Sequence, residues 1–467
     1  AQALESARPL NQQLDIIPDF QPPLLHLITH GAIQFGRQEW WLRTIGALIP
    51  GLVTVAATYL IGKKIFNKKA GLIAAFLLAT SSFHIFYSQE LRPYSLPAMF
   101  GALSWLFLID PAMFAKAKIV KWAGYGILTA LGLYSSYLYP FLIFGQIIYV
   151  ILFKRGWFKS LMTNLLGAGL AFAPWLPTFL KQLKTGQQLR QTLPGWEEVV
   201  SLTQLKALPL SIGKFIYGVI NLDLNFRFIG LTSLILLISS LLFAAKKFKK
   251  KSPDQFNQAL NFSLSWFLLP LISAWLVSFA VPVVRPKRLL LIQPSLYLIF
   301  GIIIATHLKT SKKHLAKTLA IGLLILLTTI NVSAVYQYYS KPEYQRENWR
   351  NLYQQIETRF PQNQTIAVFS FKQPFAPWRW YNQDQFGSLA TGKNNIKNVD
   401  DLTQRLKPIY DYEYVLVFDY LRDLTDPDNQ IIQTVENYGY RSVGFMEKPG
   451  IGFVRIYAKD QPISLKP

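Results

Sequence analysis

The sequence is dominated by long apolar runs that carry almost no charge. The clearest runs span residues 48–62, 71–87, 141–153, 228–245, 263–281, 289–306 and 319–335. Several reach the roughly 18 to 20 residues that a helix needs to cross the hydrocarbon core of a bilayer. Because backbone amides in lipid must be hydrogen-bonded internally, these runs are predicted to be helices. The sequence therefore predicts an α-helical polytopic membrane protein.

The net charge of +23 is distributed in the way that sets membrane topology. Basic residues concentrate in short connections at 62–70, 115–121, 154–159, 246–251 and 309–317. The alternate connections, which are poorer in basic residues and richer in aromatic ones, are 87–94, 134–140, 181–225 and 281–288. Since basic loops stay in the cytoplasm, the second set is predicted to lie outside. This pattern is typical of a membrane protein and argues against nucleic-acid binding, and the lack of cysteine excludes disulfides and thiolate metal sites.

About ten spans are predicted, which places both termini on the outer side. The expected spans are 40–62, 70–87, 94–112, 120–135, 137–153, 160–180, 226–245, 259–281, 288–307 and 316–336. Residues 40–338 are then the transmembrane domain, and the polar segment 1–39 is part of a first outer loop. Nothing in that segment could carry the N-terminus across a membrane, so we expect an upstream helix before Ala1, with a cleaved signal peptide as the alternative.

Residues 339–467 are polar and mixed in charge, and they predict a small extracytoplasmic α/β domain. Strands are expected near 365–371, 414–420 and 452–458, and amphipathic helices near 349–358 and 429–438. This part of the sequence contains no phosphate-binding loop, metal cluster or catalytic triad, which favours a structural or substrate-shaping role. The aromatic segment 375–381 could stack on a sugar, but anchoring at the membrane interface is the favoured interpretation.

The first group of polar residues that could carry chemistry precedes the first predicted span. Asp19 could accept a proton, bind a cation or orient a hydroxyl group, or it could simply cap a helix. Gln21 and His26 lie on the same element, and His26 alone is interpreted as structural.

The second and third groups lie on predicted outer connections. Glu90 and Arg92 lie between Tyr87 and Tyr94; a guanidinium suits phosphate, although the two charges could instead pair and fix the hairpin. The segment 285–288 places Arg285, Lys287 and Arg288 outside, against the usual charge bias, where they could bind a lipid phosphate or anionic headgroups. Sugar transfer from a phospholipid donor needs such cations for its leaving group and a carboxylate base for its acceptor.

These motifs, in this order, resemble the GT-C membrane glycosyltransferases, in particular the bacterial branch related to protein O-mannosyltransferases and the lipid A aminoarabinose transferase. The most specific of them is Tyr87-Ser88-Gln89-Glu90-Leu91-Arg92-Pro93-Tyr94. The other segments that carry the resemblance are 19–24, 40–43, 62–66, 288–294 and Trp349-Arg350.

The resemblance implies a GT-C-like helical bundle in the cell membrane that transfers a sugar, with inversion, from a polyprenyl-phosphate-linked donor to an outer lipid, glycan or protein acceptor. It implies that the catalytic acids or metal ligands are Asp19 and Glu90. The residues that it implies for the donor phosphate are Arg92, Arg285 and Arg288. Those that it implies for the substrate cavity are Gln21, His26, Tyr87 and Tyr94. A divalent metal is compatible with the resemblance, which implies no cofactor firmly.

The sequence also departs from the family pattern. The leading acid pair of the family would fall before Ala1, Gln21 replaces a frequent His or Lys, and Ser136 and Leu289 replace a His and a Tyr. Two alternatives therefore stay open: a lipid-linked sugar flippase or transporter, and a catalytically inactive GT-C scaffold. A transporter is expected to carry ionisable residues near the middle of the membrane. Because the centres of the predicted spans carry few charges, the glycosyltransferase hypothesis is favoured over the transporter.

Overall fold

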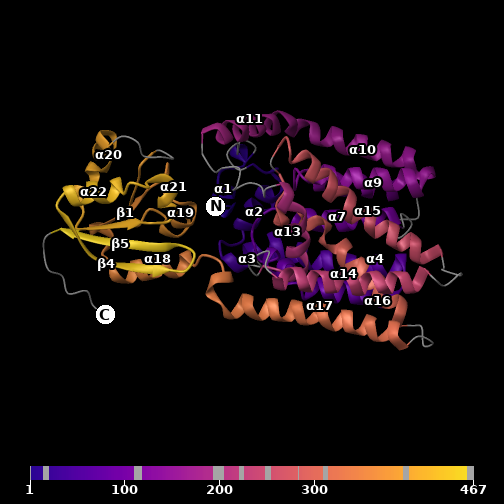
Figure 1. Ribbon diagram of the computed structural model, residues 1–467. Helices are drawn as coiled ribbons and strands as arrows, with labels where there is room; N and C mark the ends of the chain where they lie inside the picture. Colours follow the sequence, from indigo (N-terminus) through magenta and orange to yellow (C-terminus); the bar gives the residue numbers. More distant parts are fainter. Residues whose placement is uncertain are drawn as a thin grey trace. The chain divides into compact units, whose positions relative to one another are not determined.

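The computed structural model describes residues 2–13, 20–109, 118–192, 204–219, 226–247, 254–281, 283–308, 314–392 and 399–459. The chain divides between Ser340 and Lys341 into two compact units. The first unit is helical and the second is built around a sheet (Figure 1). The predicted fold class, a helical membrane protein with a small C-terminal α/β domain, is confirmed at this level.

In the helical unit, most of the long helices run alongside one another (Figure 1). Its elements are α1 (Gln2–Ser6), η1 (Leu10–Gln12), α2 (Leu24–Ile33), α3 (Glu39–Arg43), η2 (Thr44–Leu48), α4 (Ile49–Ile65), α5 (Lys68–Ala79), α6 (Ser82–Tyr87), α7 (Ser95–Ile109), α8 (Lys118–Leu133), α9 (Tyr139–Phe153), η4 (Arg155–Trp157), α10 (Phe158–Phe172), η5 (Ala173–Trp175), α11 (Leu176–Thr192), α13 (Gln204–Tyr217), α14 (Phe226–Lys247), α15 (Asp254–Val277), η6 (Pro286–Ile292), α16 (Gln293–Leu308) and α17 (His314–Ser340).

Within the described residues, five helical segments are long and apolar enough to cross a membrane: Glu39–Ile65, Phe228–Ala245, Gln255–Val277, Pro286–Leu308 and His314–Ser340. The shorter apolar helices include α2, α7 and α9. Two predicted spans are broken, 70–87 into α5 and α6, and 160–180 by η5. The expected outer loop 181–225 holds the end of α11 and all of α13. Hydropathy missed α11 because its Leu, Lys and Gln residues favour a helix without making it apolar.

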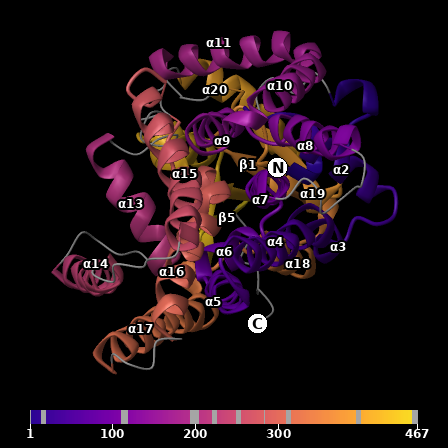
Figure 2. The same ribbon diagram turned by 90° about the vertical axis from the view of Figure 1, so that its right-hand side faces the viewer.

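The segment Pro286–Leu308, which contains η6 and α16, is the centre of the helical unit. In its most apolar window 89% of the residues are buried, against 17% for Phe228–Ala245, which marks the latter as peripheral. Glycines let the backbones approach closely around α16: a Cβ on Gly301 would lie 2.6 Å from the carbonyl oxygen of Ala70, and one on Gly71 would lie 2.4 Å from that of Tyr59. Small residues serve helix packing in membranes in this way. Figure 2 shows α4, α5 and α16 together.

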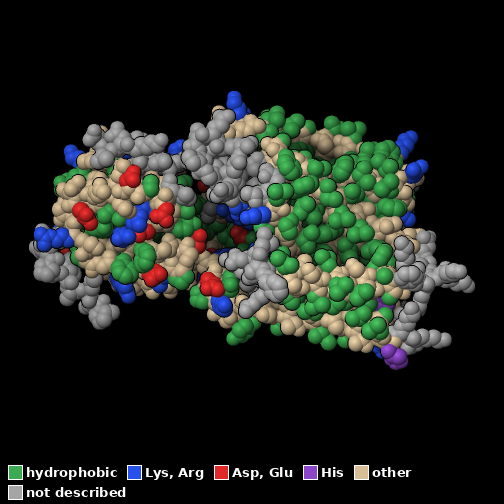
Figure 3. All heavy atoms as spheres, viewed as in Figure 1, with side chains coloured by type: hydrophobic (Ala, Val, Ile, Leu, Met, Phe, Trp, Pro, Cys, Tyr) green, Lys and Arg blue, Asp and Glu red, His purple; other side chains and the backbone are tan. Residues whose placement is uncertain are grey.

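The helical unit has two distinct ends. The turn between α9 and α10, with the exposed Lys154, Arg155 and Lys159, lies at the same end as the start of α17 (Figure 1). The labels of α2 and α3 lie at the opposite end. Between the ends, the face in Figure 3 is covered by hydrophobic side chains, as expected for a surface that contacts lipid.

The C-terminal unit contains, within the described residues, a five-stranded sheet in the order β2-β1-β3-β5-β4. Strands β2, β1 and β3 are parallel, and β5 is antiparallel to both β3 and β4. The elements are α18 (Trp349–Arg359), β1 (Thr365–Phe369), α19 (Ala376–Asn382), β2 (Gly387–Ala390), α20 (Val399–Leu406), β3 (Tyr414–Phe418), α21 (Arg422–Thr425), α22 (Gln430–Asn437), β4 (Tyr440–Lys448) and β5 (Gly452–Lys459), with short turns η7 (Pro342–Tyr344), η8 (Gln362–Gln364) and η9 (Lys407–Asp411). The three predicted strands and both predicted helices are present, whereas β2 and β4 were missed.

Helices cover both faces of this sheet. Ala367, Phe369, Leu416 and Phe418 face a core that contains residues of α18 and α19, while the alternate strand residues face α20 and α22. The interpretation of 375–381 as an interfacial anchor is wrong for Phe375 and Trp378, whose side chains are 7% and 1% exposed. These two aromatic side chains pack on Phe369 instead.

Candidate functional site

Two of the predicted groups come together in the helical unit. Lys287 interacts electrostatically with Glu90 and with all three predicted phosphate ligands, Arg92, Arg285 and Arg288. We call Arg92, Arg285, Lys287 and Arg288 the basic cluster. All four side chains and Glu90 are half-buried. Four cations against one carboxylate leave a local net charge of +3, which is suited to an anion.

Tight turns place the two halves of the basic cluster. Between α6 and α7, the Arg92 amide donates to the Glu90 carbonyl at 2.7 Å, and the Tyr94 amide donates to the Arg92 carbonyl at 2.8 Å. Both are compact three-residue turns. The other half begins η6, where the Arg288 amide donates to the Arg285 carbonyl at 3.0 Å. The Arg288 guanidinium also donates to the Val283 carbonyl, at 3.5 Å.

The basic cluster lies at the end of the helical unit that is opposite the start of α17. The segment formed by η6 and α16 ends at Leu308, shortly before α17 begins at His314, so the arginines at its beginning lie at the other end. Gln89 agrees with this placement, because it is hydrogen-bonded to Tyr338 and Tyr339 in the last turn of α17. The two segments that carry the basic cluster therefore meet at the edge of the apolar spans.

An aromatic wall borders the basic cluster. The ammonium group of Lys287 lies 5.6 Å from the ring centroid of Tyr94, within the range of a cation–π contact. The Tyr94 ring packs on Tyr87 at 5.0 Å, and Tyr87 packs on Phe83 at 4.8 Å. The structure therefore brings both predicted tyrosines next to the cations, where an apolar or sugar surface could contact them.

His26 and Gln21, the other predicted cavity residues, belong to a buried hydrogen-bond network. The imidazole Nδ1 of His26 lies 3.0 Å from Gln2 Nε2 and 3.1 Å from Ser6 Oγ, and its Nε2 lies 2.6 Å from Gln21 Nε2. The Gln21 amide also donates to Gln2 Oε1 at 2.6 Å. Sequence reasoning missed Gln2 and Ser6, because a lone Gln and Ser in a short N-terminal helix give no pattern. The arrangement agrees with the structural interpretation of His26.

The π-helical turn η2 connects this network with the basic cluster. A Cβ on Gly46 would lie 2.4 Å from Leu91 Cδ1 and 3.2 Å from Leu25 Cδ1. Leu25 precedes His26, and Leu91 lies between Glu90 and Arg92. Gly46 thus allows both segments to pack against the start of α4, in a type of turn that is frequent at functional sites.

Several expectations fall outside the described residues. Asp19 is one of them, as are Trp196 and Glu197 of the expected outer loop 181–225. Among the residues that the structure describes, no group of three or more His, Asp or Glu side chains could hold a metal ion. The metal prediction for Asp19 and Glu90 therefore stays a prediction.

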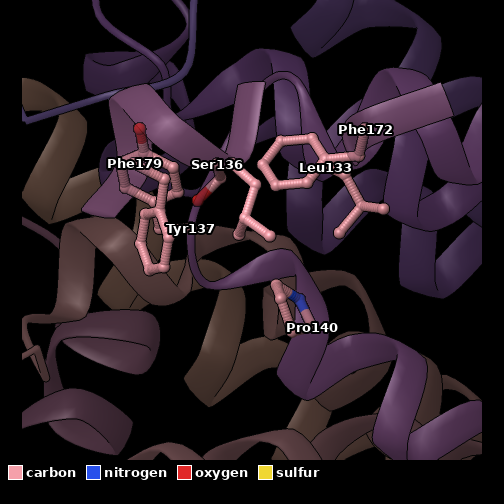
Figure 4. A pocket seen from close by; sticks show the side chains of 7 residues that line it. Leu133, Ser136, Tyr137, Pro140, Phe172 and Phe179 are labelled. Carbon is pink, nitrogen blue, oxygen red and sulfur yellow. The ribbon is translucent and has the colours of Figure 1, made fainter. Parts of the chain in front are cut away.

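Ser136, which stands where the family often has a His, lines an apolar pocket of about 100 Å³. Figure 4 shows the rings of Tyr137 and Phe179 side by side next to Ser136. The Tyr137 hydroxyl donates to Gln182 and accepts a hydrogen bond from Trp175 Nε1. Because the Tyr137 hydroxyl already makes these two hydrogen bonds and most of the other lining residues are apolar, this pocket offers few polar groups to a phosphate, unlike the basic cluster.

The profile of the family described as dolichyl-phosphate-mannose-protein mannosyltransferase matches residues 21–180. A search among curated proteins found no match. Among solved structures, ArnT from Cupriavidus metallidurans in the apo state is similar at 11% identity and a TM-score of 0.54, over 98% of this chain and 93% of ArnT. The same protein bound to undecaprenyl phosphate gives 11% identity and a TM-score of 0.55, over 98% and 92%. The Archaeoglobus fulgidus oligosaccharyltransferase gives 13% identity and a TM-score of 0.48, over 98% and 69%.

The expected relationship to the GT-C glycosyltransferases, to ArnT and to O-mannosyltransferases is confirmed by the family match and the shared fold. At 11% identity the likeness to ArnT shows the fold alone. At the general level, these findings support a membrane glycosyltransferase.

Proposed function

We propose that this chain, a multi-pass membrane protein with the GT-C glycosyltransferase fold, transfers a sugar from a polyprenyl-phosphate-linked donor to an extracytoplasmic acceptor, with inversion. The observation that carries the proposal is the basic cluster gathered around Lys287. The structure of ArnT bound to undecaprenyl phosphate supports this class of donor, since it shows the same fold binding a lipid phosphate. We further propose that the protein lies in the cell membrane with its C-terminal unit outside.

The charge of the basic cluster fits the leaving group of this reaction. As the sugar–phosphate bond breaks, negative charge accumulates on the lipid phosphate, and fixed cations stabilise that charge most where water is partly excluded. The half-buried Arg92, Arg285 and Arg288 provide guanidinium forks that can bind two phosphate oxygens each. Lys287 adds a point charge between them.

The position of the basic cluster suits a lipid donor. The cluster lies where η6 begins a span and where α7, a shorter apolar helix, starts after the Glu90–Tyr94 turn. A phosphate held there would lie at the membrane edge, while its prenyl chain would extend along the apolar helices. Cations at this depth are costly without a function, which supports a binding role over a structural one.

Glu90 is the candidate base among the described residues. Its interaction with Lys287, one of the cations that would hold the donor phosphate, supports a role for its carboxylate in taking the proton of an incoming hydroxyl or amine. Attack from the side opposite the phosphate inverts the anomeric configuration in a single displacement. Asp19 remains a second candidate acid, and the acceptor is proposed only as a lipid, glycan or protein.

The proposal is tested by transfer of radiolabelled sugar from polyprenyl-phosphate donors in proteoliposomes. We expect transfer by the wild type and its loss in Glu90→Gln and Arg92→Ala. Glu39→Gln is the matched control, because Glu39 pairs with Arg43 at 3.2 Å and has no role in the proposal. Lipid phosphate binding without transfer from any donor would instead support the flippase or the inactive scaffold.

A further inference from the structure

A buried amide bridges three elements, two of which lead into the segments that carry the basic cluster. Gln293, the first residue of α16, is fully buried, and its Nε2 donates to Ser81 Oγ at 3.0 Å and to the Phe215 carbonyl at 3.3 Å. Ser81 is the N-cap of α6, and Phe215 lies in the last turn of α13. Both N–H groups of one amide are therefore used to connect separate helices.

The orientation of this amide follows from its partners. If the amide were turned over, its oxygen would face the Phe215 carbonyl, and two acceptors would oppose each other. The same carbonyl accepts a second hydrogen bond from the Tyr297 hydroxyl at 2.8 Å. Phe215 is near the end of α13, where backbone carbonyls lack helical partners, so α16 satisfies the end of that helix.

The bridge joins the two segments that carry the basic cluster. From Ser81 the chain continues through α6 into the turn that holds Glu90 and Arg92. In the other direction, Gln293 directly follows η6, and Arg288 lies five residues earlier, or about 10 Å at the rise of a 3-10 helix. The hydrogen bond between Gln293 and Ser81 therefore constrains the distance between Arg92 and Arg288.

Charge alone does not fix the spacing of the two segments. Arg285, Lys287 and Arg288 repel one another within one segment, whereas on the other segment Glu90 attracts Lys287 more strongly than Arg92 repels it. Gln293 is itself fully buried, and so are the three residues before it, Leu290, Leu291 and Ile292. Water is therefore a poor competitor for the bridge, and an unmade hydrogen bond there is costly.

We propose that Gln293 is a positioning residue that holds the two halves of the basic cluster at the spacing required for a lipid phosphate. This inference rests on the proposed function, because it concerns the same binding site. Gln293 touches neither donor nor acceptor in the proposal. It acts by keeping the cation geometry populated before the lipid arrives, which lowers the apparent dissociation constant of the lipid.

The test is the binding of polyprenyl phosphate, without sugar transfer, to the full-length protein in nanodiscs. Gln293→Leu keeps much of the side-chain volume and removes both bridging hydrogen bonds. The expected loss of affinity is roughly three- to fifteenfold, bounded by what interhelical hydrogen bonds contribute in membranes. Transfer should show the same change in KM for the donor with a nearly unchanged kcat.

Ser295→Ala is the matched control. Ser295 is also fully buried on α16, but its hydroxyl donates locally to the Ile292 carbonyl at 2.6 Å and connects no second helix. A double-mutant cycle with Ser81→Ala isolates the bridge: if Gln293 acts through Ser81, the two losses of affinity will be clearly less than additive. Thermal unfolding of each variant accounts for general destabilisation.

The outcomes separate this proposal from the proposed function. If Arg288→Ala weakens lipid binding but Gln293→Leu binds like the wild type, the positioning role is wrong and the phosphate site stands. Equal losses in Gln293→Leu and Ser295→Ala, or fully additive effects with Ser81→Ala, would also overturn it. If the wild type itself does not bind polyprenyl phosphate, the proposed function is wrong, and Gln293 loses its role with it.

Discussion

Replacing Arg288 with alanine should weaken the binding of polyprenyl phosphate by roughly 10- to 150-fold. The estimate takes about 1.5 to 3 kcal/mol for a hydrogen bond to a charged group, at 1.4 kcal/mol for each factor of ten. The upper part of this range applies if the half-buried site excludes water, because Coulomb interactions strengthen as the local dielectric falls. Arg288→Lys, which keeps the charge but not the planar fork, should lose less affinity than the alanine variant.

Arg288→Ala should lower the thermal stability of the lipid-free protein much less than it lowers the affinity for the lipid. Arg288 belongs to a group of cations that repel one another, so its removal relieves repulsion. Among the described residues it costs a long contact of 3.5 Å to the Val283 carbonyl and an electrostatic interaction with Tyr94. Binding and thermal stability should therefore separate, with affinity falling while the unfolding temperature stays constant or rises. This separation distinguishes a binding residue from a structural one.

Binding is measured by titration of the lipid into protein in nanodiscs at low and at physiological ionic strength. Arg155→Ala is the control, since Arg155 is exposed on η4, at the other end of the helical unit, and donates only locally to the Ile151 carbonyl among the contacts described here. Equal affinity of Arg288→Ala and wild type, with both proteins folded, would refute the phosphate role of the basic cluster.

Four further changes test other parts of the structure. Gly71→Ala should lower the thermal stability of the helical unit by about 1 to 3 kcal/mol or more, because its Cβ would meet the Tyr59 backbone carbonyl at 2.4 Å, whereas Gly322→Ala, with nothing within 4 Å, should be neutral in the same unfolding assay. Trp378→Ala should cost about 3 to 5 kcal/mol in the C-terminal unit, measured as faster limited proteolysis of that unit, since the indole is 1% exposed and would leave a cavity. Burial raises the pKa of Asp426 above its ordinary value of 3.8, so its stabilising contribution is complete below that value and is lost as the pH rises through the raised pKa; Asp426→Asn should remove this slope from unfolding curves measured as the pH rises above 3.8. If a divalent metal is bound at Asp19 and Glu90, a chelator should abolish transfer and an added divalent cation should restore it. Full activity after chelation would contradict the metal prediction.

The helical fold was largely predictable because backbone amides in lipid must be hydrogen-bonded within the chain. Runs such as 228–245 and 319–335 leave the backbone no alternative to a helix. The break at Ser81 was not predictable, because Ser81 follows Thr80 within an apolar run and its capping bond to the His84 amide is a local choice. In the C-terminal unit, β4 was missed because most of its residues alternate irregularly between polar and apolar types at the edge of the sheet.

The candidate site was predictable in its members and not in its geometry. Arg288 stood out because it lies with two other cations on an outer connection, against the usual charge bias, and Arg92 stood out because its guanidinium suits a phosphate. That Lys287 lies at the centre of the basic cluster depends on how η6 turns, and no pattern in the sequence specifies this turn. Gln293 was not noticed at all, because a single amide at the start of an apolar helix has no signature until its partners from α6 and α13 are placed against it.

The π-helical turn η2 has a consequence for the evolution and engineering of this chain. A π-helical turn accommodates about one residue more than an α-helix in the same length, so deleting one residue from Thr44–Leu48 would restore a regular helix. Each residue of an α-helix corresponds to about 100° of rotation. The deletion would therefore turn α3 about its axis relative to α4 and carry the buried Leu42 out of its contacts, while the span itself would remain long enough for the membrane. One residue thus sets the helical phase between the N-terminal segment and the transmembrane core.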